Sequence, residues 1–436
     1  MHRIAWTTLL LASVTTCSIA TGGAERQKAS PAPFPGVLDE HPIIQYAQRP
    51  THDRISRLNS ALAEATASLR FQEQGGYLRS VLDVLNVASE SQVLVFSKTG
   101  VQRAATSPQS PRAIFFNDSV VVGFIPGARF LELAAHHPEQ GVVFYTLEQS
   151  PTAKPEFTRR TDCLTCHVSA TTLEVPGLIN RSTFARADGS VIGQLGFNLV
   201  NHRTPLLERW GGMYVTGTYT ATPYTGRKEH MGNVTMGGDP AGGPTSSSEV
   251  FIEWLNSDAA ARGYPAHDSD IASLMVFDHQ THATNLLTRL NWETRVALSD
   301  GRPDFAGGAL RALVDEVTDY LLFVDEAPPP ARITPRAGFA ERFLADARKD
   351  RQGRSLREFD LETRLLKYPC SYMVYTDAFE RLPAGAKNAV YQRMWTILSG
   401  RDRAAKYSHL SASDRRAILA ILRDTKKDLP DAFRSS

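Results

Sequence analysis

Cysteine is scarce in this chain, with only four among 436 residues. So low a content excludes the disulfide-stapled scaffolds of small secreted domains. If Cys17 leaves with a leader segment, three cysteines remain, and an odd number argues against a framework made only of disulfides. We expect Cys163 and Cys166 to share one chemical purpose and Cys370, among apolar neighbours, to be a buried free thiol.

An excess of charge of one sign is also missing. The 48 basic and 46 acidic residues leave a net charge of +2, which predicts no nucleic-acid partner. Long hydrophobic runs are absent too, because no segment after the N-terminus approaches 18 consecutive apolar residues. We therefore expect no membrane span in the mature chain. The composition, 42% hydrophobic and 22% charged, is that of a globular protein.

The N-terminus predicts a secretory signal peptide over residues 1–20. Arg3 precedes the apolar run I-A-W-T-T-L-L-L-A-S-V, which is too short to span a bilayer, and small residues follow up to Ala20. We expect cleavage near Ala20 and export, to the periplasm or beyond. The alternatives are an anchor helix or a lipid on Cys17. Residues 21–50, rich in proline, predict a linker.

The remaining pattern predicts an α+β fold. Helical spacing of apolar residues over 51–85 is followed by four short β-branched and aromatic runs, which predict a mostly antiparallel sheet. These runs are Q-V-L-V-F-S, A-I-F-F-N-D, S-V-V-V-G-F-I and G-V-V-F-Y-T-L. The Gly- and Thr-rich residues 171–250 predict functional loops.

Helical periodicity returns after these loops. It runs over 270–287 and 308–324 and stops at the proline run 328–330, which we take as the domain boundary. The first domain would thus comprise residues 51–327, and residues 332–436 would form an all-helical C-terminal segment. Ser411 and Asp414 give an S-x-x-D start signal for its last helix.

The chemistry of the chain is concentrated in R-T-D-C-L-T-C-H-V-S-A, residues 160–170. C-x-x-C-H is the attachment signature of c-type haem. Two thiols three positions apart on a helical turn can reach both vinyl groups of one porphyrin, and the adjacent imidazole can bind its iron. Cys163 and Cys166 would form the thioethers and His167 would be the proximal ligand. At the chain's own residue frequencies the pattern arises by chance in roughly one such sequence in a thousand.

Three other readings of the pattern each lack a component. A zinc ribbon needs a second C-x-x-C or a histidine pair, and Cys370 stands alone. A thioredoxin-like disulfide needs a buried strand before the motif, and T-A-K-P-E-F-T-R-R-T-D is too polar. A structural disulfide across two residues would close only a tiny loop and stabilise little.

The sequence does not determine which residue is the second axial ligand of the iron. His230, in the Gly-bounded loop G-R-K-E-H-M-G-N, is our first choice, because histidine and methionine are usual partners of haem iron. Met231, Met213 and His279 are the alternatives, although a buried hydrogen-bonded role suits His279 better. An iron with an open face is also possible.

Several other polar side chains bear on the site. Haem propionates need cationic or hydrogen-bonding partners. Four arginines are near the motif in the sequence, and each by itself reads as a solvated surface residue: Arg159, Arg160, Arg181 and Arg209. We expect His136 and His137, which precede a proline in a polar stretch, to be solvated.

C-L-T-C-H followed by P-G-L-I-N-R-S resembles the haem-binding segment of bacterial c-type cytochromes. The wider pattern, including E-R-W-G-G-M-Y-V-T-G, H-M-G-N and L-K-Y-P-C-S-Y, is similar to large exported cytochrome c-domain proteins of environmental bacteria such as planctomycetes. The resemblance implies one covalent haem on Cys163 and Cys166 with iron ligation by His167. More than a hundred residues precede the motif, which departs from the small cytochromes.

Three classes of function are compatible with such a haem. We favour electron transfer to and from a redox partner protein, which the sequence does not identify. A haem enzyme of peroxidase or oxidase type would need an open iron site, and a gas sensor would need the same. A single C-x-x-C-H excludes a two-haem relay.

Overall fold

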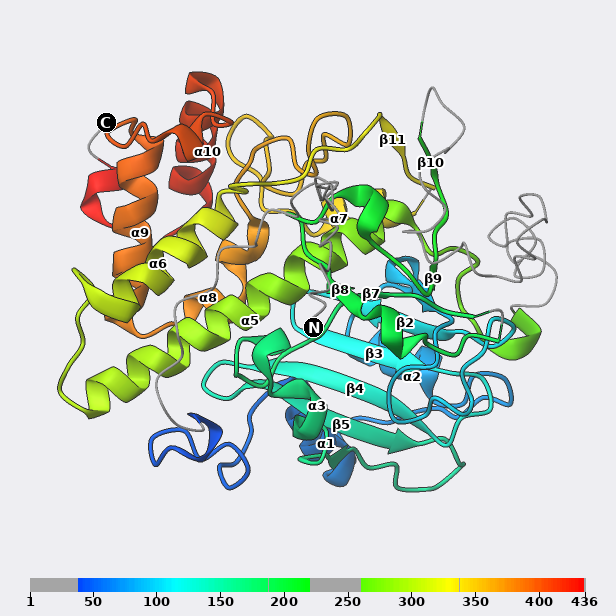
Figure 1. Cartoon of the computed structure of the whole chain (residues 1–436). Helices are drawn as coiled ribbons and strands as arrows, with labels where there is room; N and C mark the ends of the chain where they lie inside the picture. Colours follow the sequence, from blue (N-terminus) through cyan, green and yellow to red (C-terminus); the bar gives the residue numbers. More distant parts are fainter. Residues whose placement is uncertain (1–37, 187, 220–259, 337, 435–436) are drawn as a thin grey trace, which may run out of the picture.

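The structure, a computed structural model, describes residues 38–186, 188–219, 260–336 and 338–434. The expected signal peptide, most of the proline-rich linker, His230 and Met231 lie outside these ranges. An antiparallel sheet region is followed by a largely helical C-terminal part, which confirms the α+β fold (Figure 1).

The main sheet has seven antiparallel strands in the order β6-β5-β4-β3-β2-β1-β9. They are β1 (Val93–Val95), β2 (Arg112–Phe116), β3 (Val120–Phe124), β4 (Phe130–His137), β5 (Gly141–Glu148), β6 (Thr158–Arg159) and β9 (Met213–Tyr214). Two further pairs are small: β7 (Arg181–Thr183) with β8 (Phe197–Leu199), and β10 (Thr218–Tyr219) with β11 (Ile333–Thr334).

Strand β4 was absent from the expected strands, and our expectation that its last two residues are solvated was wrong. His136 pairs with Val142 and His137 with Gly141 along β5. His137 is only 6% exposed, and its Nδ1 accepts the backbone N–H of Gln140 at 3.2 Å. The two histidines at the end of β4 interrupt the alternation of apolar residues by which a strand is recognised in a sequence. They are buried because the strand pairs with β5, and local composition does not show this pairing.

The register divides the main sheet into two faces with different roles. Side chains alternate between faces along each strand, so Leu94, Ala113, Phe115, Val122 and Leu133 share one side. That side packs with α1 (Arg54–Ala63) and α2 (Leu78–Val84) into a buried cluster. The opposite face points toward the cysteine–histidine segment and α5.

The remaining helices include both that were predicted after the loops, although the one predicted over 270–287 extends to Ser299. They are α3 (Leu164–His167), α5 (Ile271–Ser299), α6 (Gly308–Leu321), α7 (Phe339–Ala345), α8 (Asp377–Glu380), α9 (Ala384–Leu398) and α10 (Ala412–Thr425). Ser411 caps α10 and forms the predicted capping box with Asp414. In the described part of the chain, no helix is both long and apolar enough to cross a bilayer.

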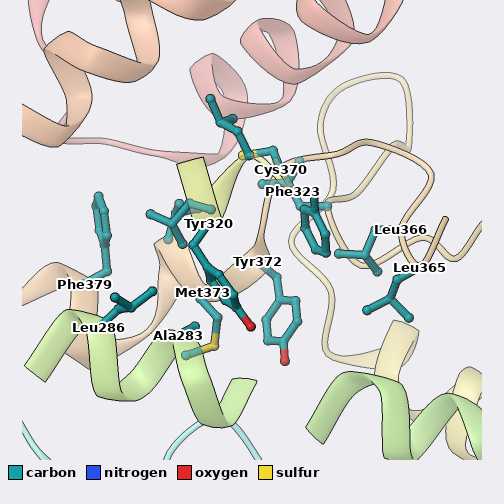
Figure 2. Close-up of a cluster of buried hydrophobic side chains, with 14 of the residues drawn as sticks. Ala283, Leu286, Tyr320, Phe323, Leu365, Leu366, Cys370, Tyr372, Met373 and Phe379 are labelled. Atoms are coloured by element: carbon teal, nitrogen blue, oxygen red, sulfur yellow. The ribbon is translucent and has the colours of Figure 1, made fainter. Parts of the chain in front are cut away.

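Helix α5 runs through the middle of the molecule and joins its two halves (Figure 1). One buried cluster contains residues from both sides of the proline run 328–330, and Figure 2 shows Met373 and Phe379 beside Ala283 and Leu286 of α5. Cys370 is fully buried in the same cluster as a free thiol, as predicted, and burial raises its pKa to about 12.

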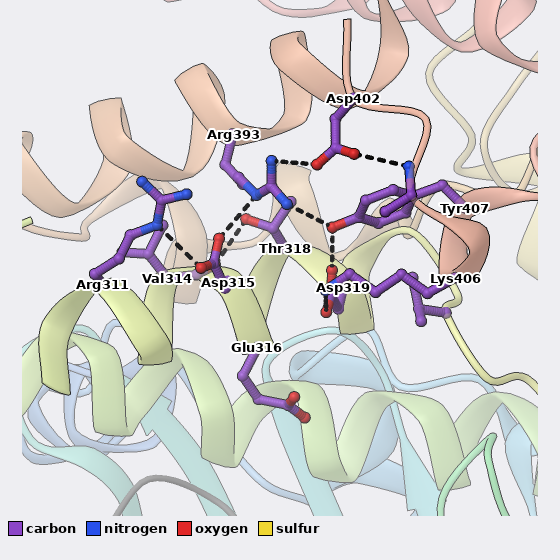
Figure 3. A network of polar contacts seen from close by, with 12 residues as sticks. Arg311, Val314, Asp315, Glu316, Thr318, Asp319, Arg393, Asp402, Lys406 and Tyr407 are labelled. Atoms are coloured by element: carbon purple, nitrogen blue, oxygen red, sulfur yellow. Dashed lines mark hydrogen bonds and ion pairs between the residues drawn. The ribbon is translucent and has the colours of Figure 1, made fainter. Parts of the chain in front are cut away.

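Polar contacts connect the C-terminal helices to α6 outside this apolar core (Figure 3). Arg393 of α9 bonds Asp315 of α6 and Asp402, each at 2.8 Å, and also donates to the hydroxyl of Tyr407 at 2.9 Å. Tyr407 in turn donates to Asp319 of α6 at 2.8 Å. Such a network fixes the relative position of α6 and α9 more firmly than an isolated surface pair would.

Candidate functional site

The cysteine–histidine cluster lies on the single helical turn α3, shortly after edge strand β6. The backbone N–H of His167 donates to the carbonyl of Cys163 at 3.0 Å, and Cys166 follows Cys163 by three positions, so both sulfurs lie on the same side of the turn. Cys163 is half-buried beside Phe144, Cys166 is exposed, and both are free thiols. The pair is thus reachable from solvent at the rim of the protein.

His167 is held in one tautomer. Its Nδ1 lies 2.8 Å from the carbonyl oxygen of Gly177, which can only accept, so Nδ1 carries the proton and Nε2 the lone pair. Its ring centroid lies 4.5 Å from that of Phe144. Burial lowers the pKa of His167. The hydrogen bond to the Gly177 carbonyl opposes this lowering, and the positive charges of Arg181 and Arg112 add to it. The result is a neutral imidazole with a basic nitrogen available to a metal.

Asn285 of α5 fixes the carbonyl that orients His167. Its Oδ1 accepts the backbone N–H of Leu178 at 3.0 Å, and its Nδ2 donates to the Leu178 carbonyl at 2.8 Å. Gly177 packs so closely that a Cβ there would stand 2.4 Å from Asn285 Oδ1. The glycine permits this approach, and the asparagine then determines where the Gly177 carbonyl lies.

Replacing Asn285 by leucine is expected to release the orientation of His167. The change leaves the partly buried N–H and C=O of Leu178 without their side-chain partner, which costs at most about 1 to 3 kcal/mol for each group. In the haem-free chain, ¹⁵N NMR of His167 should change from a pure Nδ1–H tautomer to a mixture. Asn291→Leu is the matched control, because Asn291 is a buried asparagine of the same helix that bonds Pro138 instead. An unchanged tautomer in Asn285→Leu would contradict the prediction.

A cavity lies on the sheet face below this turn, and His167 is part of its wall. The space between the lining atoms is about 1050 Å³, including the part open to solvent. The floor is mostly apolar and comes from alternate positions of the strands: Val93, Val95, Arg112, Ile114, Val121, Gly123, Glu132, Ala134, Phe144 and Met213. Gly123 lies in mid-strand on this floor, where a Cβ would be in van der Waals contact with Glu132 at 3.5 Å, and the absence of a larger side chain suits close approach of a flat ligand.

Of the described candidates for a second iron ligand, Met213 lines the cavity but at its far end. Strand β9 is five strand positions from β5, against which His167 packs, or about 24 Å at the usual spacing. His279 faces elsewhere, because its Nδ1 bonds His202 Nδ1 at 2.7 Å and its Nε2 bonds Ser371 Oγ at 2.6 Å. His230 and Met231 lie outside the described residues.

The His202–His279 pair is fully buried, between Tyr320, Phe323 and Ser371. This is the hydrogen-bonded arrangement that we considered the better interpretation of His279. For His202, which lies in a turn, it is a contact that sequence spacing does not reveal. Burial lowers the pKa of His279 to about 3 and that of His202 well below its ordinary range, with neighbouring positive charge adding to both effects. Both rings are therefore neutral in the folded protein.

Acidification is expected to destabilise the fold through this pair. Each folded-state pKa is below the unfolded value of about 6.5, so stability is complete above that pH and is lost as the pH falls below it. Each ring contributes up to about 1.4 kcal/mol per pH unit. His279→Gln should therefore reduce the loss in free energy of unfolding between about pH 7.5 and 5.5 by about 1 kcal/mol, measured in urea. The exposed His52→Gln should leave the loss unchanged; equal behaviour of both variants would contradict the assignment.

The four arginines near the motif in the sequence lie in different environments in the structure. Only Arg181 lines the cavity. Arg159 donates to the backbone carbonyls of Tyr46 and Arg49. Arg160 pairs with Asp162 at 2.6 Å. Arg209 is 1% exposed, so our reading of it as a surface arginine was wrong. From the sequence we missed Arg112 as a residue of the site, although it lies on the cavity floor. Arg112 and Ile114 are two positions apart on one strand, so the alternation of side chains could have placed both on the same face.

Arg209 belongs to a buried polar group around Asp278 of α5. Asp278 Oδ2 accepts from Arg209 Nη1 at 3.2 Å and from Trp210 Nε1 at 3.1 Å, and Oδ1 accepts from the amide of Asn180. Burial raises the pKa of Asp278 to about 7, opposed by the charge of Arg209 and by these hydrogen bonds. Because Asn180 lines the cavity, this group and Asn285 together hold the cavity wall over 177–180.

Within the described ranges, no three or more His, Cys, Asp or Glu side chains are arranged to hold a metal ion by themselves. A haem iron does not need such a set, because the porphyrin supplies four nitrogens and the protein adds one or two ligands. No family of known proteins, no curated protein and no solved structure matches the chain.

Proposed function

We propose that the protein is an exported mono-haem c-type cytochrome that transfers electrons. The observation that carries the proposal is the orientation of His167. Its Nδ1–H is committed to the Gly177 carbonyl, its Nε2 is free among the described residues, and its ring lines a mostly apolar cavity. The two free thiols belong to the same helical turn, although neither is among the residues that line the cavity. This is the arrangement that a covalently attached, histidine-ligated haem requires.

Each part of the site would have a distinct task. Bound haem would supply one-electron redox chemistry at iron. Cys163 and Cys166 would hold it covalently, and His167 would present a basic nitrogen to the iron in a fixed orientation. Ile114, Ala134 and Phe144 would exclude water from one face of the ring, which favours retention of haem in both oxidation states.

The proposal is tested by producing the full chain, with its leader, in a host that attaches c-type haem in its periplasm. We expect the exported protein to show the pyridine haemochrome spectrum of c-type haem at one haem per chain. An exported, folded chain that carries no covalent haem under conditions in which a reference cytochrome matures would contradict the proposal.

A haem enzyme or gas sensor is the second candidate, and one observation favours it. Among the described residues of the cavity, His167 is the single histidine, and Met213 stands at the far end of the sheet. A low-spin ferric spectrum would support electron transfer with two strong ligands. A high-spin spectrum that changes with cyanide or peroxide would support an open iron. His230→Ala tests our first choice of distal ligand, which predicts loss of the low-spin spectrum.

A further inference from the structure

We propose that Arg112 and Arg181 bind the two propionate carboxylates of the haem held by Cys163, Cys166 and His167. This inference rests on the proposed function and identifies the polar end of the same site. The two arginines come from different sheets, Arg112 from β2 on the cavity floor and Arg181 from β7, and both line the cavity that His167 lines.

Both guanidinium groups have unused hydrogen-bonding capacity. Arg112 Nη2 donates to Thr99 Oγ1 at 2.9 Å, and Nη1 lies 3.5 Å from Glu132 Oε2, while its buried Nε has no partner in the described structure. Arg181 stacks on the Phe197 ring at 4.9 Å and has no ion-pair partner among the described residues. A guanidinium carries five N–H donors, so both can still bind a carboxylate in bidentate fashion.

The separation of His167 and Arg112 within the cavity suits a haem. His167 packs on Phe144 of β5, and Arg112 stands three strand positions away on β2, about 14 Å at the usual spacing. The ring radius, a propionate arm and an arginine side chain together cover such a distance. The floor between them includes the small residues Gly123 and Ala134, which leave room for a flat ring, and also the carboxylate of Glu132.

The charge of the cavity also favours an anion. Its lining includes two arginines and one carboxylate, Glu132, so one positive charge among these three groups remains uncompensated. Glu132 also accepts a bond from Gln102 at 3.3 Å, which gives that carboxylate a second partner when Arg112 turns to a ligand. A propionate carboxylate bound to Arg112 would therefore replace a weak 3.5 Å contact by charge-assisted hydrogen bonds.

The test compares haemin with its dimethyl ester, in which both carboxylates are blocked. The full chain carrying Cys163→Ala and Cys166→Ala binds either probe without covalent attachment, and absorbance titration gives both dissociation constants. We expect preference for haemin, and we expect Arg112→Leu or Arg181→Leu to reduce that preference about tenfold each. Arg160→Leu is the matched control, because Arg160 is near the motif but outside the cavity.

Arg181→Leu leaves no hydrogen-bonding group of the described residues without its partner, so this variant is expected to fold. It therefore still tests the inference if Arg112→Leu does not fold. Arg112→Lys, which keeps the charge but loses the planar fork, should give an intermediate preference. In the matured protein, where the thioethers keep haem in every variant, each Arg→Leu change should lower the reduction potential.

Equal affinity of the parent chain for both probes would overturn the inference, as would cavity variants that behave like Arg160→Leu. Neither result would affect the proposed function, which is tested separately by covalent attachment in the matured wild-type protein.

Discussion

Replacing Cys163 and Cys166 together by alanine is expected to abolish covalent haem attachment completely. The thioether sulfurs would be the only covalent connection between chain and porphyrin, and both stand free on one turn. Haem that His167 still bound would be extracted by acidified organic solvent. The measurement is the haem-staining band on a denaturing gel, with the pyridine haemochrome spectrum for stoichiometry.

Cys370→Ala provides the control for this experiment. Cys370 is a fully buried free thiol in the core around α5 and is absent from the cavity lining. Its replacement should reduce stability modestly and leave one haem per chain. Full covalent haem in the Cys163→Ala, Cys166→Ala chain would show that the C-x-x-C-H motif is not the attachment site.

Replacing Asp278 by leucine is expected to cost about 3 to 5 kcal/mol of unfolding free energy at pH 8, where the carboxyl is ionised. Asp278 and Arg209 are 0% and 1% exposed, so the change leaves a charged guanidinium buried without its counter-ion. It also removes the acceptor of Trp210. Guanidinium denaturation measures the loss.

Two further variants make this result interpretable. Asp278→Leu combined with Arg209→Met should recover much of the loss, because removing both members of a buried pair leaves no isolated charge. Arg311→Leu, which removes a partly exposed i,i+4 partner of Asp315, should cost at most about 1 kcal/mol. If Asp278→Leu costs no more than Arg311→Leu, the buried pair does not stabilise the fold.

Local features of the chain could be predicted because they depend on neighbours in sequence. The helical spacing of apolar residues in α5, α6, α9 and α10, the capping box at Ser411 and four of the sheet strands are of this kind. Strand β4 was missed because its polar end is buried by pairing with β5. The burial of His202 was missed because it depends on contact with His279, 77 residues away.

The sequence alone identified the C-x-x-C-H cluster and predicted the α+β class, because the motif and the periodicity of each helix or strand depend on residues that are close together in the chain. Only the tertiary structure decided what surrounds His167. Its hydrogen bond to Gly177 depends on Asn285, which is 107 residues away from the Leu178 that it holds. Arg112, Phe144 and Arg181 share one cavity only because strand register and the packing of α5 bring them together. Such contacts arise from the closing of long loops, and no local pattern specifies which segments meet.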